Sequence, residues 1–216
     1  MARPANPNLQ GALIEAGRLE FATKGLAEAR IEDITRRAGV SKGAFYLHFE
    51  SKEAMFEHIA RDFVDGLLRV MNCFDSLQTL EPRELVPAIL NCDDQVSEYL
   101  WEHRPALRIV MEGLPSTACS GLGDQFVGAL ESYMRATIVR HKETMEVFSP
   151  DTDPDVAALL LTGAIVMFCR RIVRSDDKPD FRKSSIALRK ILYGGMFRPE
   201  VGRALLDALQ AQEAHS

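Results

Sequence analysis

Residues 31–53 read IEDITRRAGVSKGAFYLHFESKE, two short amphipathic segments joined at a glycine. Apolar residues recur at helical spacing on both sides of Gly39, which predicts one helix before it and another after it. Gly39 can adopt the positive φ of a tight turn, and Ser41 is placed to cap the second helix. This helix-turn-helix pattern is typical of DNA-binding proteins, although other helical hairpins share it. The residues expected to be buried or half-buried on the second helix are Ala44, Phe45, Leu47 and Phe49.

The first turn of the second predicted helix is expected to face the bases. A recognition helix enters the major groove with its N-terminal residues nearest the base edges. Lys42 stands where the helix dipole disfavours a cation, which favours a functional role for it. Gly43 would let backbone and DNA approach closely, or would simply loosen the helix start. Ala44 offers a methyl group that suits the methyl of thymine.

The run from Ala38 to Gly43, followed by residues 46–49 and 51–53, resembles the DNA-binding segment of the tetracycline-repressor (TetR) family. The resemblance covers about residues 9–60. Upstream, the residues that resemble the first helix of that family's three-helix head, and the glycine that ends it, are Leu13, Ala16, Phe21, Lys24 and Gly25.

Three positions depart from the family's usual pattern. Ile31 stands where the family commonly has a threonine that caps the second helix and touches a phosphate, so that contact is not carried over. Thr35 replaces a common small alanine. Glu20 stands in place of a leucine before the buried phenylalanine, and we expect Leu19 to compensate in part.

The resemblance implies an all-α protein with a three-helix helix-turn-helix DNA-binding head at residues 1–52, a connecting helix at 52–73 and a helical effector-binding and dimerisation domain at 74–216. It implies a cytoplasmic homodimer on a palindromic double-stranded DNA operator, most often a repressor released by a small-molecule effector. We expect no enzymatic activity, cofactor or metal, because no motif for any of them appears in the sequence. The residues expected to contact DNA are Arg30, Arg36, Ser41, Lys42, Gly43, Ala44, Tyr46, His48 and Lys52.

Phosphate contacts are expected around the recognition helix. A phenol at Tyr46 and an imidazole at His48 suit phosphate oxygens, which position a protein without reading sequence. Lys52 follows Ser51, the expected cap of the next helix, where an ammonium beside free backbone N–H groups could dock a phosphate. Arg36 ends the first helix of the pair, where solvated charge is an equally ordinary explanation.

Charge is divided along the chain. Residues 1–52 hold eight Lys or Arg against six Asp or Glu, whereas the remainder holds 18 against 25, and the whole chain has a net charge of −5. An acidic body should avoid the duplex while the head binds it. Binding should weaken as salt rises, because phosphate contacts release counterions.

The rest of the chain is patterned as helices, with no strand-like alternation. A break at residues 149–154 places Asp153 as a cap and Pro154 in the first helical position. A loop rich in Pro, Ser, Cys and Gly is expected at residues 114–123. Helices are expected at residues 82–102, in a short segment up to 112–113, and at 124–147, 156–169, 181–194 and 199–211.

The stretch 156–169 is apolar on almost every side. Fourteen residues span about 21 Å, shorter than the roughly 30 Å hydrocarbon core of a membrane, so we expect no membrane span. Such a helix is either a central core helix or is covered in part by a second copy, with which the resemblance implies a four-helix interface. The expected interface residues are Leu160, Gly163, Ala164, Met167, Ile186 and Ile191.

A mostly apolar or aromatic effector is expected in the body. Aromatic and methionine residues at helical spacing are ordinarily core, but several lie on the helices that would enclose a cavity. The candidate effector-binding residues are Tyr99, Trp101, His103, Met111, Phe126, Tyr133 and Met134.

Other classes of protein have less support. No nucleophile–base pair, metal-binding carboxylate pattern or phosphate loop favours a helical enzyme. A protein-interaction module that kept the fold without binding DNA is a second alternative. Residues 1–4 show no signal-peptide pattern, so we expect the protein to be cytoplasmic. The four cysteines show no paired motif, so we expect them to be reduced and to serve in packing. If one of them senses redox state, the candidate is Cys119.

Overall fold

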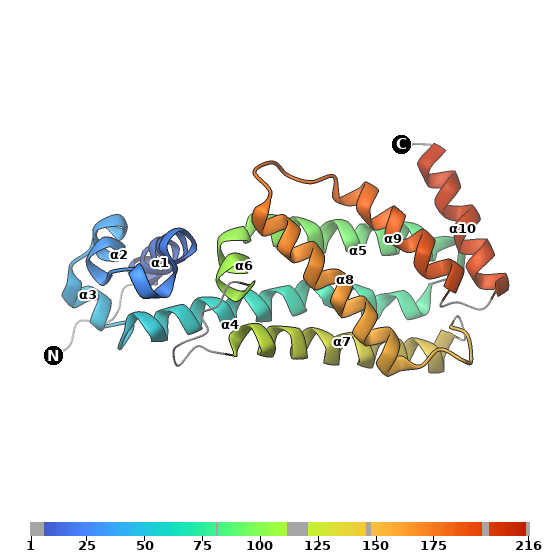
Figure 1. Ribbon diagram of the computed structural model, residues 1–216, viewed down its shortest axis with the longest axis horizontal. Helices are drawn as coiled ribbons and strands as arrows, with labels where there is room; N and C mark the ends of the chain where they lie inside the picture. The colour runs from blue at the N-terminus through green and yellow to red at the C-terminus, as the bar shows by residue number, and fades with distance from the viewer. Residues whose placement is uncertain (1–6, 81, 112–120, 146–147, 196–198, 215–216) are drawn as a thin grey trace. The chain divides into compact units, whose positions relative to one another are not determined.

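The structure of the protein is a computed structural model, and it describes residues 7–80, 82–111, 121–145, 148–195 and 199–214. These described residues form ten α-helices and one 3-10 helix (Figure 1). The all-α fold predicted from the sequence is therefore confirmed. The elements are α1 (Pro7–Glu28), α2 (Ile31–Ala38), α3 (Lys42–Tyr46), α4 (Lys52–Met71), η1 (Asn72–Thr79), α5 (Pro82–Glu102), α6 (Arg104–Met111), α7 (Leu122–Met145), α8 (Pro154–Arg174), α9 (Phe181–Gly195) and α10 (Pro199–Ala214).

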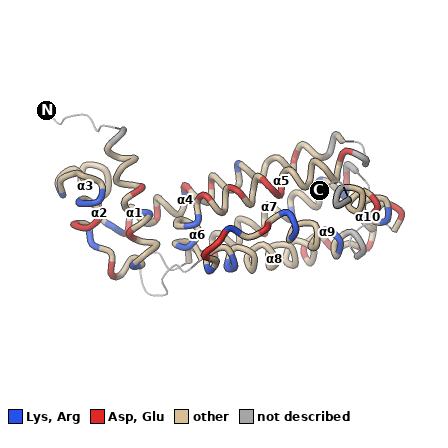
Figure 2. The backbone as a smooth tube through the Cα atoms, turned by 90° about the horizontal axis from the view of Figure 1, so that it is seen from above, with Lys and Arg blue, Asp and Glu red and all other residues tan. Residues whose placement is uncertain are grey.

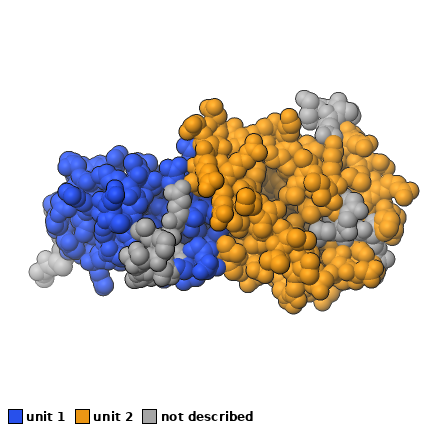
Figure 3. Space-filling model, in the orientation of Figure 1, with its two compact units in different colours: residues 1–66, 103–126 blue, residues 67–102, 127–216 orange. Residues whose placement is uncertain are grey.

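The chain folds as two compact units (Figure 3). Unit 1 comprises residues 1–66 and 103–126, and unit 2 comprises residues 67–102 and 127–216. From the sequence, the head was expected to end at residue 52 and residues 74–216 were expected to form one domain. The structure instead returns α6 to the first unit, where it packs against α1.

Unit 1 is built around aromatic side chains from helices that are distant in sequence. Phe21 of α1 meets Phe56 of α4 edge to face, with ring centroids 5.3 Å apart. Phe45 of α3 is fully buried, which anchors this short helix within unit 1. At Gly17, an added Cβ would lie 2.5 Å from the Met55 sulfur, so a larger residue there would force the buried Met55 side chain to move.

Helix ends in this unit follow their local sequence. Gly25 has φ 71°, so the backbone leaves the helical conformation there although the element continues to Glu28. This confirms the predicted glycine stop of the first helix. Glu20 is buried and pairs with Lys24 and with Arg37, whereas Leu19 is exposed. The expectation that Leu19 would compensate is therefore wrong, because the carboxylate itself occupies the interior beside two cations.

Unit 2 is a helical bundle with α5, α9 and α10 packed together. A core cluster of buried residues joins η1 and those three helices, of which α5, α9 and α10 are labelled in Figure 1. The buried members of this cluster are Leu77, Leu85, Val86, Leu90, Cys92, Ile186, Leu205 and Leu209.

Several helix bounds differ from the sequence-based expectations. The connecting helix ends at Met71, after which residues 72–79 tighten into a 3-10 helix. α8 runs over 21 residues rather than the fourteen of its apolar centre, because Asp153 caps it and Pro154 begins it, as predicted. By length and composition α8 is the one described helix that could cross a membrane, so the argument from a 14-residue length does not hold for the whole helix.

Candidate nucleic-acid interface and ligand cavity

The turn between α2 and α3 has the geometry that the sequence predicts. Gly39 adopts φ 68° and ψ 30°, the left-handed conformation that glycine reaches without steric cost. Its N–H donates to the Arg36 carbonyl, and the N–H of Val40 donates to that of Thr35. Ser41 then caps α3, since its hydroxyl accepts from the Ala44 N–H at 3.2 Å. The two helices therefore meet at a fixed turn.

One face of α3 is free for a ligand within unit 1. Phe45 anchors the opposite face, while Tyr46 is 51% and Leu47 68% exposed. Leu47 was expected to be half-buried, and this is wrong because α3 ends at Tyr46 and the helical period no longer holds beyond it. An added Cβ at Gly43 would meet nothing closer than the Ser41 hydroxyl at 3.8 Å, so internal packing does not require glycine there.

The cations around this face pair with nearby acids. Lys42 binds Glu32, and Arg36 binds Asp33 within α2. The hydrogen bond to Glu32 raises the pKa of Lys42, so this amine stays charged. Figure 2 shows acidic and basic segments side by side on α2. Lys42 and Glu32 are both exposed, so that pair costs little to exchange for phosphate, whereas Asp33 is half-buried and also binds Lys24.

Three other predicted DNA-contact residues lie near these helices. Arg30 is exposed at the N-cap of α2 and makes no side-chain capping bond, and Ile31 follows it as the first helical residue. Ala44 and His48 are half-buried. With arginine at the N-cap and isoleucine after it, the start of α2 lacks the hydroxyl cap that the TetR family commonly has there.

Lys52 serves the fold of unit 1. Its Nζ donates to the carbonyl oxygens of Leu26, Ala27 and Ala29 at 2.7, 3.1 and 3.0 Å. An ammonium has three donors, so all of them are used on the chain that follows Gly25. Ser51 caps α4 through the Ala54 N–H at 3.0 Å, as predicted. The structure thus gives Lys52 another role than the phosphate docking that the sequence suggested.

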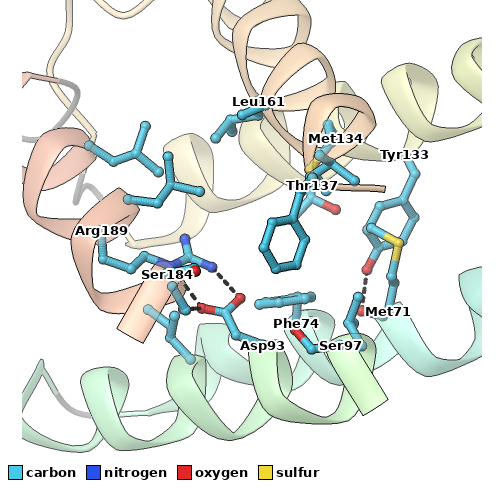
Figure 4. A pocket seen from close by; sticks show the side chains of 18 of the residues that line it. Met71, Phe74, Asp93, Ser97, Tyr133, Met134, Thr137, Leu161, Ser184 and Arg189 are labelled. Carbon is cyan, nitrogen blue, oxygen red and sulfur yellow. Dashed lines mark hydrogen bonds and ion pairs between the residues drawn. The ribbon is translucent and has the colours of Figure 1, made fainter. Parts of the chain in front are cut away.

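Unit 2 encloses a mostly apolar cavity of about 490 Å³. Its wall is formed by side chains from the end of α4, η1 and helices α5, α7, α8, α9 and α10 (Figure 4). This volume lies within the usual range of small-molecule sites. Among its apolar lining residues are Leu67, Met71, Phe74, Leu100, Ile138, Leu161, Ile165, Phe168, Leu188 and Leu192.

A charged pair closes one side of the cavity. Arg189 donates twice to Asp93, from Nη2 to Oδ1 at 2.7 Å and from Nε to Oδ2 at 3.1 Å. Ser185 also donates to Asp93, and the guanidinium lies 6.0 Å from the centre of the Phe74 ring. Because the two charges satisfy each other, this wall offers little to a charged ligand.

Polar groups also follow one face of α7. Tyr133 donates to the Met71 carbonyl at 2.6 Å, and Thr137 and His141 follow at intervals of four residues. Burial raises the pKa of Tyr133 to about 12, so the phenol stays protonated. These hydroxyl and imidazole groups are the polar part of an otherwise apolar lining.

The predicted effector residues separate into two groups. Tyr133 and Met134 line the cavity (Figure 4). Trp101 is not among the lining residues, although it packs edge to face on Phe181, which is. Phe126 lies in unit 1 against Phe63. The remaining three, which do not line the cavity among the described residues, are Tyr99, His103 and Met111.

Sequence reasoning missed a pair of neighbouring thiols. Cys73 of η1 and Cys92 of α5 hydrogen-bond to each other, and burial raises the pKa of both. Burial also raises the pKa of Cys169 to about 12. Thiols held in the protonated form are poor nucleophiles, which favours packing roles. Cys119, the predicted redox candidate, lies outside the described residues.

An apolar face of α8 and α9 is exposed on unit 2. Leu160 is 63% and Ile191 74% exposed, and Met167 and Gly163 are exposed too. Ile186, which was predicted to lie in the interface, is buried in the core of its own unit. Ala164, the remaining predicted interface residue, is half-buried and lines the cavity. Two further apolar residues of α8 are exposed, Val156 and Leu159.

The chain is similar to known bacterial regulators in sequence. The model of a family described as "Bacterial regulatory proteins, tetR family" matches residues 13–59. The repressor KstR2 of Mycobacterium tuberculosis is 33% identical over 91 residues, which are 42% of this chain and 44% of KstR2. The regulator EthR of Mycolicibacterium smegmatis is 26% identical over 186 residues, 82% of this chain and 80% of EthR. The chain matches half or less of the length of the first curated relatives.

Solved structures share the whole fold at low identity. SmeT, the repressor of the SmeDEF multidrug efflux pump of Stenotrophomonas maltophilia, has been solved as a complex with triclosan. That complex covers 89% of this chain and 93% of SmeT with a TM-score of 0.70 and 18% identity. The match to the ketosteroid transcriptional regulator KstR2 of Mycobacterium tuberculosis covers 88% of this chain and 95% of KstR2, with a TM-score of 0.64 and 22% identity. The arrangement of a helix-turn-helix and a helical body is therefore one that known regulators use.

Proposed function

Because the chain is a TetR-family transcriptional regulator, we propose that it is a dimeric repressor that leaves a palindromic operator when a small, mostly apolar effector binds. The observation that carries the proposal is the α2–α3 turn, with α3 anchored by Phe45 on one side and exposed on the other. A helix presented in this way can enter the major groove.

The start of α3 reads the bases in this proposal. Ser41, Lys42, Gly43 and Ala44 form the first turn and would lie nearest the base edges. The open space around Gly43 would let the DNA approach the backbone. The residues left to position the sugar-phosphate backbone are Arg30, Arg36, Tyr46 and His48.

The exposed face of α8 and α9 supports a homodimer. A helix as apolar as α8 needs cover, and its own unit buries only part of it. Leu160, Gly163, Met167 and Ile191 would meet the same residues of a second copy, since a twofold interface uses one patch twice. Two heads related by that axis would read half-sites about 34–36 Å apart.

The cavity supports an effector of mostly apolar character. Its lining comes largely from apolar side chains, and its one charged wall pair is internally satisfied. A related fold holds triclosan, and another is named for ketosteroids. α4 contributes Leu67 and Met71 to this lining and residues 52–66 to unit 1. An effector that favours one position of α4 could therefore change DNA affinity.

Selection of operator DNA tests the function. Purified protein is incubated with a random DNA pool, and bound DNA is amplified and sequenced. We expect enrichment of a palindrome with half-sites one helical turn apart. A reporter carrying that operator then separates repression from activation, the alternative mode. Failure to enrich any sequence would instead favour action through protein partners.

Lys42 and Lys52 should differ in what their loss changes. For Lys42→Ala we expect the slope of log affinity against log salt to fall by about 1, with little loss of stability. For Lys52→Met we expect the head to lose about 2 kcal/mol, because three carbonyl groups lose a charged donor. Its salt slope should equal that of the unmodified protein. Fluorescence anisotropy across salt concentrations and thermal melts measure the two quantities, and a reduced slope for Lys52→Met would restore its predicted phosphate contact.

A further inference from the structure

His141 is a buried polar side chain with an unpaired nitrogen at the cavity wall. It lies on α7, is 9% exposed and lines the cavity. Its ring hydrogen-bonds to the backbone of Phe74, while Nε2 has no hydrogen-bond partner among the described residues. Nearly all buried polar atoms in proteins are paired, so an unpaired one on a residue that lines a cavity indicates a place where a bound ligand could supply the missing partner.

The hydrogen bond to Phe74 defines what Nε2 can do. This bond supports the protonated ring, so the backbone group is the carbonyl and the imidazole donates to it from Nδ1. Burial, and then the neighbouring Arg140, lower the pKa of His141 despite the opposing effect of Asp75. The ring is therefore neutral at pH 7, with its hydrogen on Nδ1 and a lone pair on Nε2. Nε2 is a hydrogen-bond acceptor.

The groups beside His141 narrow the ligand further. Thr137 lies one helical turn earlier on the same face, and its buried hydroxyl, although close to Tyr133, makes no well-aligned hydrogen bond. Tyr133 has given its hydrogen to Met71. Arg189 is held by Asp93, and the other lining arginine, Arg171, is exposed to solvent. No cation in the described lining is thus both buried and available to an anion.

We propose that the effector is an uncharged, largely apolar molecule with a hydroxyl group that donates to Nε2 of His141 and accepts from the hydroxyl of Thr137. Only the regulatory role of this molecule rests on the proposed function; its binding site does not. A ketone or an ether has no hydrogen for Nε2. A carboxylate would face a neutral acceptor in an apolar wall, which leaves its charge uncompensated.

Isomeric probes test the hydroxyl. 1-Nonanol and methyl octyl ether have the same atoms and nearly the same apolar length, and nonanoate adds the charged case. Binding is followed by isothermal titration calorimetry and by the fluorescence of Trp101, the only tryptophan, which packs on the cavity residue Phe181. We expect 1-nonanol to bind about three- to tenfold more tightly than the ether, and nonanoate to bind least. Equal affinities, the reverse order or no binding of any probe would overturn the proposal.

Two variants and a matched control locate the hydroxyl. In His141→Phe the preference for 1-nonanol should disappear, and in Thr137→Val it should shrink. Thr162→Val is the control, because Thr162 of α8 is also buried with an unpaired hydroxyl but does not line the cavity. The Thr162→Val protein should prefer 1-nonanol over methyl octyl ether as strongly as the unmodified protein does. A preference that survives His141→Phe, or that Thr162→Val removes, would contradict the assignment.

The experiment does not depend on DNA. The ranking of the three probes in the unmodified protein is decisive even if a variant fails to fold. If operator selection fails while 1-nonanol binds as expected, the regulatory function is wrong and the hydroxyl site stands. If an operator is found and the probes do not rank as expected, the hydroxyl site is wrong and the regulatory function stands.

Discussion

Replacing Leu160 by aspartate is expected to convert the proposed dimer into monomers and to weaken operator binding by about a hundredfold or more. Leu160 is 63% exposed on an apolar face of α8. In a twofold interface one substitution introduces two carboxylates, each of which would have to be buried against apolar groups. A single head makes few base contacts, and linking a second one multiplies affinity by roughly 10² to 10⁴. Sedimentation velocity and fluorescence anisotropy measure the two effects.

The control carries the same charge elsewhere. Ala204 is exposed on α10, so Ala204→Asp should leave both the mass in solution and the operator affinity unchanged. Ala204→Asp should melt within a few degrees of the unmodified chain, since its position is not in a core, whereas Leu160→Asp should keep its helical circular dichroism and lose only the stability that the proposed dimer adds. A Leu160→Asp protein that stays dimeric and binds its operator normally would show that this face of α8 is not the interface.

The head could be predicted largely because its signals are local. A glycine between two amphipathic segments needs positive φ, and Gly39 has it. A serine just before a helix caps it, and Ser41 does. Lys52 could not be placed in this way, because the carbonyl groups that it binds lie 23 to 26 residues earlier in the chain. Glu20 is similar, since Arg37 comes from another helix.

In the body, periodicity identified helices but not their neighbours. A helical stripe shows which residues share a face and leaves open what that face meets. Thus Ile186 and Ile191 were grouped in one interface, although the first is in the core and the second is exposed. The apolar stripe of α4 was assigned to a connection, and its last residues, Leu67 and Met71, line the cavity.

One missed feature had a signal in the sequence. Asp93 lies among Ile89, Leu90 and Val96 on its helix, and Arg189 lies beside Ile186 and Leu192, so opposite charges in two largely apolar settings suggest a pair. Cys73 and Cys92 had none, since their spacing matches no thiol motif and only the packing of η1 on α5 brings them together.

Arg189→Met is expected to lower the free energy of unfolding by about 3 kcal/mol, or to lower Tm by roughly 10 °C. The two side chains of this ion pair are 20% and 17% exposed, so the carboxylate of Asp93 would remain largely buried with Ser185 as its main donor. Leaving one buried charge without its partner costs more than the pair itself contributes. Urea titration followed by circular dichroism measures the loss.

The same two helices supply a matched control and a rescue. Arg182 of α9 pairs with Asp94 of α5, but both side chains are 43% exposed, so Arg182→Met should cost less than about 1 kcal/mol. Replacing both partners, as Asp93→Leu with Arg189→Met, should recover most of the stability, because no buried charge is left. If Arg189→Met were no more destabilising than Arg182→Met, water would have to reach Asp93 through the cavity. The wall beside Phe74 would then be solvated, and the case for an uncharged ligand would weaken with it.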